Sequence, residues 1–469
     1  MDYKVVIIGA GPGGTVLARE LAKSGIDVTI YEKGDYNSLG HNWSDAVEYV
    51  ALKEAGLDMP SLVGKQWKGV LVKEDPDGEG LFEKHAIPRL RLYCPDYSSV
   101  KEIEFRMITT DRKNLGKVLV DQAVSAGAIV KYGYEGDGLL YREKGNSSAE
   151  DVEVYGVRVK NLSDGQVEDI EAHIVVESSG FASVLRKSLP AYTGLAQSFK
   201  DSEFGFVNRE VRLRKDDEAK TDIIPDHYRY GYHQGYQWSH EHNDKYIDIG
   251  AGVKNDPENP DPKDLIEEFI SRHPSVGEEK VRGGRGLCIV GPPLKNFVTN
   301  GFFVIGDAAS TSVPTTGCGA GSAILVALWS SEVIKEAAKE GRNDISALWG
   351  INKKFYIEND RGASFAALSA LRGILQSLTH DQLNFLFRFD IMDKEALEDA
   401  VNGIFSLPKF KAKLKSLGRG LLKPKVLLKL NKATGKGAKI YSHYRNYPQS
   451  WDREVFAGWS TEAEKLFED

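Results

Sequence analysis

The chain has 469 residues, of which 41% are hydrophobic and 28% charged, and its formal net charge is −7. This length is large for a single compact domain, so we expect two interleaved lobes. Its three cysteines show no C-x-x-C spacing, which excludes a zinc ribbon and a four-cysteine iron–sulfur cluster. The sequence lacks a signal-peptide pattern and an apolar run of about 20 residues. We therefore expect a cytoplasmic protein that is soluble or attached to a membrane surface.

The N-terminal residues predict a β–α–β unit. Residues 3–8 form a mostly apolar run typical of a buried parallel strand. Residues 15–25 predict a helix that ends at Gly25, and residues 27–33 predict the next strand. The turn between the first strand and the helix is rich in glycine.

This turn, Gly9-Ala-Gly11-Pro-Gly-Gly14, predicts a dinucleotide site. Gly9 permits the tight turn, Gly11 lets a phosphate approach the backbone, and Gly14 lets the helix pack on the strand. The N–H groups and dipole of the helix N-terminus would then stabilise a pyrophosphate. Glu32 ends the second strand near the expected position of a ribose-binding acid, and Lys33 follows it.

The middle of the chain predicts short strands separated by one helix at 114–126. The strands are expected at 89–95, 103–109, 128–136, 152–159, 170–177, 228–238, 245–253 and 302–305. After Gly321 the pattern is helical through roughly residue 399.

A second glycine-rich segment follows the strand at 302–305 and begins with Gly306-Asp307. The Asp307 carboxylate can accept hydrogen bonds from ribityl hydroxyls, and the next loop can direct N–H groups at the N1–C2=O edge of a flavin. The two segments together predict FAD as the cofactor. The candidate flavin contacts in the loop are Pro314, Gly317, Gly319 and Ala320.

These segments resemble the flavoprotein superfamily typified by para-hydroxybenzoate hydroxylase. Arg112, which follows Asp111, resembles the arginine that approaches the FAD phosphates in that family. The segment from Glu177 to Ser183 resembles its third strand-end motif, which an arginine such as Arg186 usually follows. The resemblance implies FAD contacts at Arg112 and Gly180.

Nearly the whole chain resembles the geranylgeranyl reductase branch, which saturates C=C bonds of polyprenyl chains with reduced FAD. The segment Ser44-Asp45-Ala46 resembles the family's Cys-Gly-Asp-Ala segment, which implies FAD contacts there. Tyr236-Gln-Trp238 resembles the start of its Tyr-x-Trp-x-Phe-Pro motif. Two departures stand out. Trp43-Ser44 replaces Cys-Gly, so the candidate active-site cysteine is absent, and His240-Glu241 replaces Phe-Pro.

We expect an α/β fold in which a Rossmann-type FAD-binding domain is interleaved with a mixed β-sheet substrate domain, followed by a mainly helical C-terminal region. The FAD-binding domain is predicted at 1–80, 105–190 and 285–340, the substrate domain at 81–104 and 191–284, and the helical region at 341–469.

The catalytic hypothesis is hydride transfer from N5 of reduced FAD to one alkene carbon, with a proton delivered to the other. Alternation on a strand places Tyr236, Trp238 and His240 on one face, which lines the substrate cavity in the family. His240 is a candidate proton donor because its unperturbed pKa is near neutrality, and Trp43 is a candidate cavity residue. A histidine without a role and ordinary core aromatics remain alternatives.

Other functions stay open. A flavin-dependent monooxygenase, hydroxylase or halogenase is one, and an electron-transfer flavoprotein is another, although three scattered cysteines cannot hold the usual cluster. A single dinucleotide fingerprint predicts an external electron donor such as NAD(P)H, ferredoxin or another carrier. The irregular spacing of His227, His233 and His242 does not favour a metal site.

Residues 407–440 mix lysines with apolar residues and contain no acidic residue. Such a segment can lie on an anionic membrane surface, which would suit an enzyme that takes its substrate from a bilayer. A solvated helical hairpin explains the pattern equally well. Nucleic acid is not an expected partner, because the chain is acidic overall and no recognition fold is visible.

Overall fold

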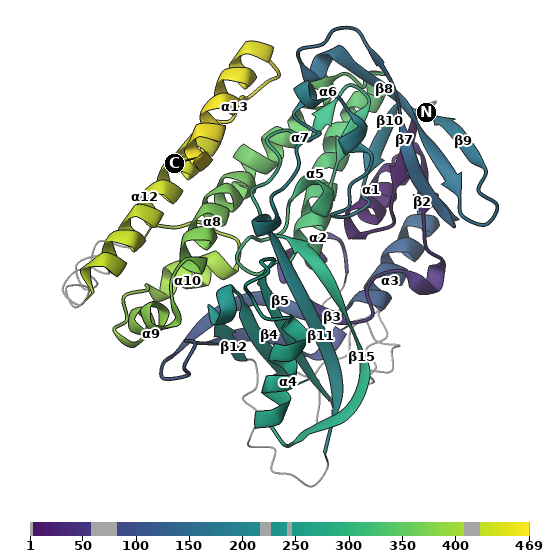
Figure 1. The fold of residues 1–469 in the computed structure, drawn as a ribbon. Coiled ribbons are helices and arrows are strands. Elements are labelled where there is room, and N and C mark those ends of the chain that lie inside the picture. The colour runs from purple at the N-terminus through teal and green to yellow at the C-terminus, as the bar shows by residue number, and fades with distance from the viewer. Residues whose placement is uncertain (1–2, 58–81, 216–226, 242–245, 408–422, 469) are drawn as a thin grey trace.

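The architecture combines three β-sheets with a set of C-terminal helices (Figure 1). It is seen in a computed structural model that describes residues 3–57, 82–215, 227–241, 246–407 and 423–468. The predicted fold class is confirmed: a Rossmann-type sheet, a mixed sheet and a helical C-terminal region are all present.

The Rossmann-type sheet has the strand order β16-β17-β10-β1-β2-β6 and is parallel except for β16. Its central strands are short apolar runs buried on both faces, as parallel strands require. The strands are β1 (Lys4–Ile8), β2 (Asp27–Glu32), β6 (Ile129–Tyr132), β10 (Ile174–Glu177), β16 (Val298–Thr299) and β17 (Phe302–Val304).

Helix α1 (Pro12–Ala22) packs against both α3 (Arg112–Ser125) and α5 (Ala320–Lys339) beside this sheet. A separate antiparallel sheet packs against β2 and β10. Its strands are β7 (Tyr134–Glu143), β8 (Val152–Asn161) and β9 (Val167–Glu171).

The single strand predicted at 170–177 is wrong, because that run is divided between two sheets. β9 ends at Glu171 and pairs with β8, whereas β10 begins at Ile174 and pairs with β1. Both halves carry strand-forming residues, so periodicity alone does not mark the corner between them.

The mixed sheet has the order β15-β11-β14-β13-β12-β4-β5-β3. Helix α4 (Pro262–Arg272) covers one face, where Leu265 and Phe269 pack on Ile247 and Ile249. On the other face, Leu383 and Leu386 of the C-terminal helices pack with Leu92 of the sheet, so only part of that face is open to form a site. The strands are β3 (Ser44–Glu48), β4 (Phe82–Tyr93), β5 (Val100–Asp111), β11 (Phe204–Arg214), β12 (His227–Tyr230), β13 (Tyr236–Glu241), β14 (Tyr246–Lys254) and β15 (Val276–Ile289).

This sheet curls until side chains of its two end strands meet. Arg282 of β15 donates to Ser44 Oγ of β3 at 2.8 Å and pairs with Asp111. The Trp43 ring, just before β3, lies over Gly284 of β15, where a Cβ atom would come within 2.6 Å of the ring. The curl gathers residues from distant segments around one concave face.

The domain division made from the sequence remains a prediction. The boundary at 104/105 falls inside β5, and the boundary at 284/285 falls inside β15. β3, assigned to the first domain, pairs with β5 in the mixed sheet. The chain thus passes between the two large sheets within single elements.

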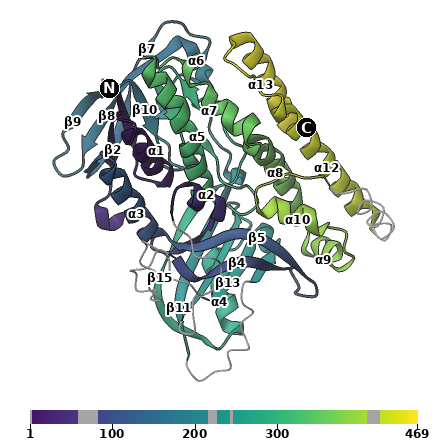
Figure 2. The same ribbon diagram turned by 180° about the vertical axis from the view of Figure 1, so that it is seen from behind.

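The C-terminal helices stand beside both sheets (Figure 1). α8 and α12 pack together, and α10 packs on β5, as Figure 2 shows from behind. Among the described helices, none combines the length and apolar character needed to span a bilayer. These helices are α8 (Arg361–Gln376), α9 (His380–Arg388), α10 (Lys394–Val401), α12 (Pro424–Arg445) and α13 (Arg453–Glu468).

Candidate functional site

The first glycine turn packs against the end of β10. Gly9 has φ +101°, and a Cβ atom there would overlap the Ser178 carbonyl. A Cβ atom on Gly14 would lie 2.6 Å from the Gly9 oxygen, and the Gly14 N–H donates to Ser178 Oγ at 3.1 Å. Gly11 is less crowded, since a Cβ atom there would lie 3.7 Å from the nearest Ser178 atoms. The turn is thus fixed by two glycines and open at the third.

Glu32 lies beside this turn, at the end of β2. Its carboxylate accepts hydrogen bonds from Ala10 N at 2.7 Å and Gly34 N at 2.9 Å. A ribose-binding acid is expected in this place, next to the turn that would hold the pyrophosphate. Lys33, the next residue, is exposed.

Arg112 offers a donor that the described part of the chain leaves unbonded. Its side chain is 11% exposed, and its Nη1 pairs with Asp45 Oδ2 at 3.2 Å. Among the described residues, nothing accepts a hydrogen bond from its buried Nε. Buried donors in native proteins are nearly always bonded, so a group that the protein itself does not supply is expected here.

The second glycine segment builds a buried acidic position. Asp307 accepts from Ser312 Oγ at 2.8 Å. Burial raises the pKa of Asp307, while the Ser312 hydroxyl and the Arg112 charge act in the opposite direction. A Cβ atom on Gly319 would come within 2.8 Å of Asp307 Oδ1, so only glycine leaves the carboxylate room.

Two helices begin at these glycine turns without a side-chain cap. The N-cap of α1 is Gly11, and that of α5 is Gly319, directly before Ala320. An uncapped helix start presents N–H groups and a partial positive charge. One start suits a pyrophosphate and the other suits the N1–C2=O edge of a flavin ring.

The residues therefore fit FAD. The donor on Arg112, the acids Glu32 and Asp307, and the two uncapped helix starts come from segments far apart in sequence. Arg112 lies 3.2 Å from Asp45, and Gly319 packs against Asp307, so the predicted contacts adjoin in pairs. Their chemistry matches the phosphate, sugar and ring parts of one dinucleotide.

The third motif, which begins at Glu177, supports the turn at Gly306–Ala309. Glu177 is fully buried and accepts from Leu185 N at 3.0 Å and Arg186 N at 2.8 Å. The buried Arg186 donates to Ala308 O at 2.9 Å. Arg186 thus holds the Gly306–Ala309 turn in place. Gly180 has φ +77° and remains a predicted FAD contact.

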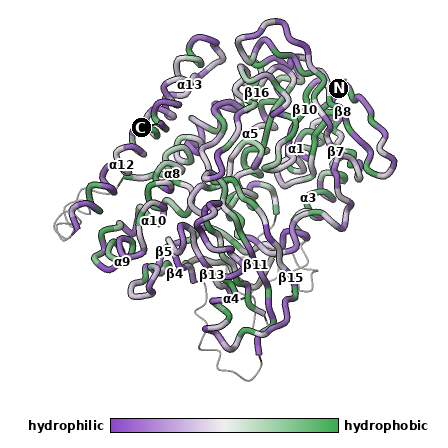
Figure 3. The backbone as a smooth tube through the Cα atoms, viewed as in Figure 1, coloured by the Kyte–Doolittle hydropathy of each residue, from purple (hydrophilic) through white to green (hydrophobic). Residues whose placement is uncertain are grey.

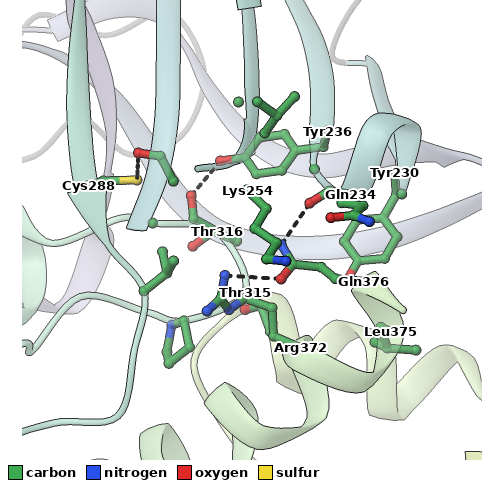
Figure 4. A pocket seen from close by; sticks show the side chains of 18 of the residues that line it. Tyr230, Gln234, Tyr236, Lys254, Cys288, Thr315, Thr316, Arg372, Leu375 and Gln376 are labelled. Atoms are coloured by element: carbon green, nitrogen blue, oxygen red, sulfur yellow. Dashed lines mark hydrogen bonds between the residues drawn. The ribbon is translucent and has the colours of Figure 1, made fainter. Parts of the chain in front are cut away.

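A small pocket of about 60 Å³ lies between the mixed sheet, the loop after Asp307 and helix α8 (Figure 4). Pro314 and Gly317 of the predicted flavin loop form part of its wall, together with Tyr236. The Tyr236 hydroxyl donates to Thr316 O, so the strand that lines the pocket is tied to the loop. Apolar walls come from Val207, Val253, Val290 and Leu375.

The predicted face of β13 is only partly in this wall. The Tyr228 ring contacts Tyr236, Trp238 and His240, with centroids 5.5, 6.4 and 5.2 Å away, so the three lie on one face as predicted. Tyr236 lines the pocket, whereas Trp238 and His240 do not. His240 is 4% exposed and its Nε2 lies 3.0 Å from the Tyr228 hydroxyl.

Trp43 also lies outside the pocket wall. Its ring stacks on His41 with centroids 4.3 Å apart, and its carbonyl accepts from Arg112 N at 3.1 Å. Trp43 is therefore placed beside the predicted FAD contacts. Ser44 and Ala46 are buried in β3 next to it.

Sequence reasoning missed a buried ion pair under the aromatic face. Arg209 Nε donates to both oxygens of Asp248, at 2.9 and 2.8 Å, and Trp238 Nε1 donates to Asp248 Oδ1 at 3.3 Å. Arg209 also reaches Asp45 Oδ1 at 3.4 Å. The sequence signal that could have revealed this pair is Asp248 inside the apolar run 246–253, because a buried carboxylate requires partners.

One cysteine lies in the pocket wall, although the sequence predicted none at the site. Burial raises the pKa of the Cys288 thiol to about 12. Its Sγ donates to Gly205 O at 3.6 Å. The group therefore stays a neutral thiol and acts as a small apolar wall residue rather than as a nucleophile.

Comparisons with known proteins agree with this geometry. Residues 7–53 match the family model of the NAD(P)-binding Rossmann-like domain. The chain is 26% identical to the digeranylgeranylglycerophospholipid reductase of Sulfolobus acidocaldarius, over 97% of each chain. It is also 26% identical to the same-named reductase of Methanothrix thermoacetophila, over 82% of this chain and 90% of that one.

The predicted resemblance to the geranylgeranyl reductase family is confirmed. Among solved structures, a geranylgeranyl bacteriochlorophyll reductase-like protein of Thermoplasma acidophilum has a TM-score of 0.67 at 19% identity, covering 92% of this chain and 99% of that one. The flavin-dependent brominase Bmp2 has a TM-score of 0.60 at 16% identity, covering 90% and 98%. This chain therefore shares its fold with both of these proteins.

Proposed function

We propose that this chain is an FAD-dependent oxidoreductase that reduces C=C bonds of a prenyl or other lipid-like substrate. The observation that carries the proposal is the pocket between the mixed sheet and α8. It has mostly apolar walls and ends at the loop through Pro314 and Gly317, where the flavin ring is expected. The names of the relatives, which are reductases of geranylgeranyl lipids, support the same substrate class.

FAD, when bound, would supply the hydride that reduces the alkene. The protein's part is to hold the cofactor and exclude water. The α1 start and Arg112 would bind the phosphates, Glu32 the ribose and Asp307 the ribityl chain. The Pro314–Ala320 segment would hold the ring edge against the pocket, whose apolar walls keep an alkene dry beside it.

The direct test is anaerobic turnover. Purified protein loaded with FAD and reduced with dithionite is mixed with a geranylgeranyl lipid, and products are followed by mass spectrometry. We expect two hydrogens to be added for each reduced bond. A colourless protein that cannot be reconstituted with FAD would contradict the proposal. Oxygen uptake coupled to substrate would instead indicate the hydroxylase or halogenase reaction.

His240 is retained as the proposed proton source, acting through the Tyr228 hydroxyl that it contacts. The His240→Phe variant restores the family's aromatic residue and removes the proposed proton donor. We expect kcat to fall about tenfold or more, since general acid catalysis contributes at least this much. Bound FAD, read from its absorbance, should not change. Unchanged kcat would remove His240 from the mechanism.

Electrons are proposed to come from an external donor, either NAD(P)H, ferredoxin or another carrier. Anaerobic bleaching of the bound flavin by each candidate in turn identifies which one serves. We also propose that the protein is cytoplasmic and attaches to a membrane surface through its basic region. Residues 408–422 of that region lie outside the described residues, and α12 carries the remainder.

A further inference from the structure

Arg372 of α8 is a buried cation that, within the described part of the chain, has no carboxylate in hydrogen-bond contact. It is 8% exposed, and among the described residues its Nε has no hydrogen-bond partner. Its other nitrogens make long bonds to neutral groups, from Nη1 to Gln376 Oε1 at 3.3 Å and from Nη2 to Ser202 O at 3.4 Å. Burial lowers the pKa of Arg372, while the charge of Glu203 acts in the opposite direction. A buried guanidinium with only long bonds to neutral groups among the described residues costs folding free energy, so its retention points to a ligand.

The guanidinium lies where two hollows meet. A second hollow, of about 450 Å³, shares four wall residues with the pocket beside the flavin loop. Within the shared wall, Gln376 Nε2 donates to Gln234 O at 2.7 Å. Figure 4 shows Arg372, Gln376 and Lys254 pointing into the same part of the pocket. The shared residues are Gln234, Lys254, Arg372 and Gln376.

The two hollows differ in character. The inner pocket is walled by valines, a leucine and aromatic rings and ends at the loop through Pro314. The outer hollow carries three cationic side chains, Arg372, Lys254 and Lys436, against one carboxylate, Glu203. Lys254 is also paired with Asp256 at 2.9 Å. A ligand with an anionic head and a long apolar tail matches this arrangement.

We propose that Arg372, assisted by Lys254, binds the phosphate of a phosphorylated prenyl lipid while the prenyl chain extends toward the flavin loop. This inference rests on the proposed function and adds a head-group subsite to it. The planar guanidinium fork binds phosphate oxygens in pairs, which a lysine cannot do. The phosphate belongs either to a prenyl diphosphate or to a prenylated glycerophospholipid, and both present the same group.

The test compares the Arg372→Gln variant with wild type, both loaded with FAD. Binding of geranylgeranyl diphosphate, of the digeranylgeranyl glycerophospholipid and of geranylgeraniol is measured by calorimetry, and KM and kcat for each by product analysis. We expect about a tenfold weaker affinity and higher KM for the phosphorylated lipids, the size of one lost charged hydrogen-bond pair. The alcohol should change less than twofold. Arg372→Lys should recover only part of the loss.

Arg272→Gln serves as the matched control, because Arg272 is an exposed arginine of α4 that lies outside both hollows and outside the basic region. It should bind all three ligands like wild type. An equal loss for alcohol and phosphorylated lipids in Arg372→Gln, or no loss at all, would overturn the subsite. The phosphorylated lipid with the larger loss identifies the source of the phosphate.

The two proposals fail separately. If wild type binds the phosphorylated lipids through Arg372 but adds no hydrogen to them, the reductase proposal fails and the subsite stands. If wild type reduces all three compounds with equal KM and the variant does the same, the reductase stands and the subsite fails. Circular dichroism and flavin absorbance of each variant confirm that the fold is retained.

Discussion

At the scale of single residues, the site depends on places where a side chain is missing. Gly9, Gly14 and Gly319 each stand where a Cβ atom would strike a neighbouring backbone or polar atom. These neighbours surround the two uncapped helix starts and the Asp307 carboxylate. The glycines therefore allow the close packing that shapes the predicted cofactor site.

Gly319→Ala should weaken FAD binding at least tenfold, because its Cβ atom would lie 2.6 Å from Ser312 Oγ and 2.8 Å from Asp307 Oδ1. Flavin fluorescence titration of the apoprotein measures the dissociation constant. Gly435→Ala is the control: this helical glycine has nothing within 4 Å of its Cβ position. There, alanine should leave FAD affinity unchanged and stabilise the helix by about 0.5–1 kcal/mol.

The Arg209–Asp248 pair should matter for stability. Asp248 is fully buried, and Asp248→Asn would remove the carboxylate charge that lies against the buried Arg209 guanidinium. We expect the free energy of unfolding in urea to fall by about 3 kcal/mol. The exposed cross-strand pair Arg158–Asp169 offers a matched control, since its bonds are similar but solvated. Asp169→Asn should leave the urea midpoint unchanged, and a comparable fall there would contradict the argument.

At the scale of elements, the sequence predicted the features that depend on residues close together in the chain. The β–α–β unit and both glycine turns were predictable because strand, turn and helix signals lie within a few residues of each other. The corner between β9 and β10, the meeting of β3 with β15, and the position of Arg372 over the pocket depend on contacts between distant segments, which no short pattern records.

Helix α12 carries the described part of the basic region. Hydrophobic and hydrophilic residues alternate along it (Figure 3). Leu428 is 68% exposed, and Lys425 and Lys432 are exposed on the same helix. An exposed leucine among lysines suits the interface of an anionic bilayer.

Leu428→Glu should therefore abolish flotation with liposomes that contain anionic lipid at low salt. The reason is that it removes the exposed apolar side chain proposed to enter the bilayer and adds a charge that the anionic bilayer repels. Val455→Glu on α13 is the control, because Val455 is 57% exposed but lies next to Glu454. Wild-type protein that fails to float at low salt would rule out the membrane role.

At the scale of the whole molecule, the cofactor is expected to join parts of the chain that are otherwise far apart in sequence. The first turn belongs to the Rossmann-type sheet, Asp45 to the mixed sheet and Gly319 to the start of α5. A ligand that contacts all three binds only the folded state and therefore stabilises it, since the unfolded chain cannot assemble the three contacts.

Thermal melting should show this directly. The melting temperature should rise with free FAD and keep rising above saturation, because a ligand at 100 times its dissociation constant adds about 2.7 kcal/mol. Gly319→Ala should show a much smaller rise over the same concentrations. A melting temperature that does not depend on FAD would mean that the two turns do not share one ligand.

The contact between β3 and β15 also bears on behaviour at high concentration. A strand at the end of a sheet exposes unpaired backbone groups that can recruit another chain. Here Trp43 lies over Gly284, and Arg282 crosses to Ser44, so each end strand is screened by side chains of the other. These side chains cover part of each edge strand, which disfavours pairing of an edge with another chain.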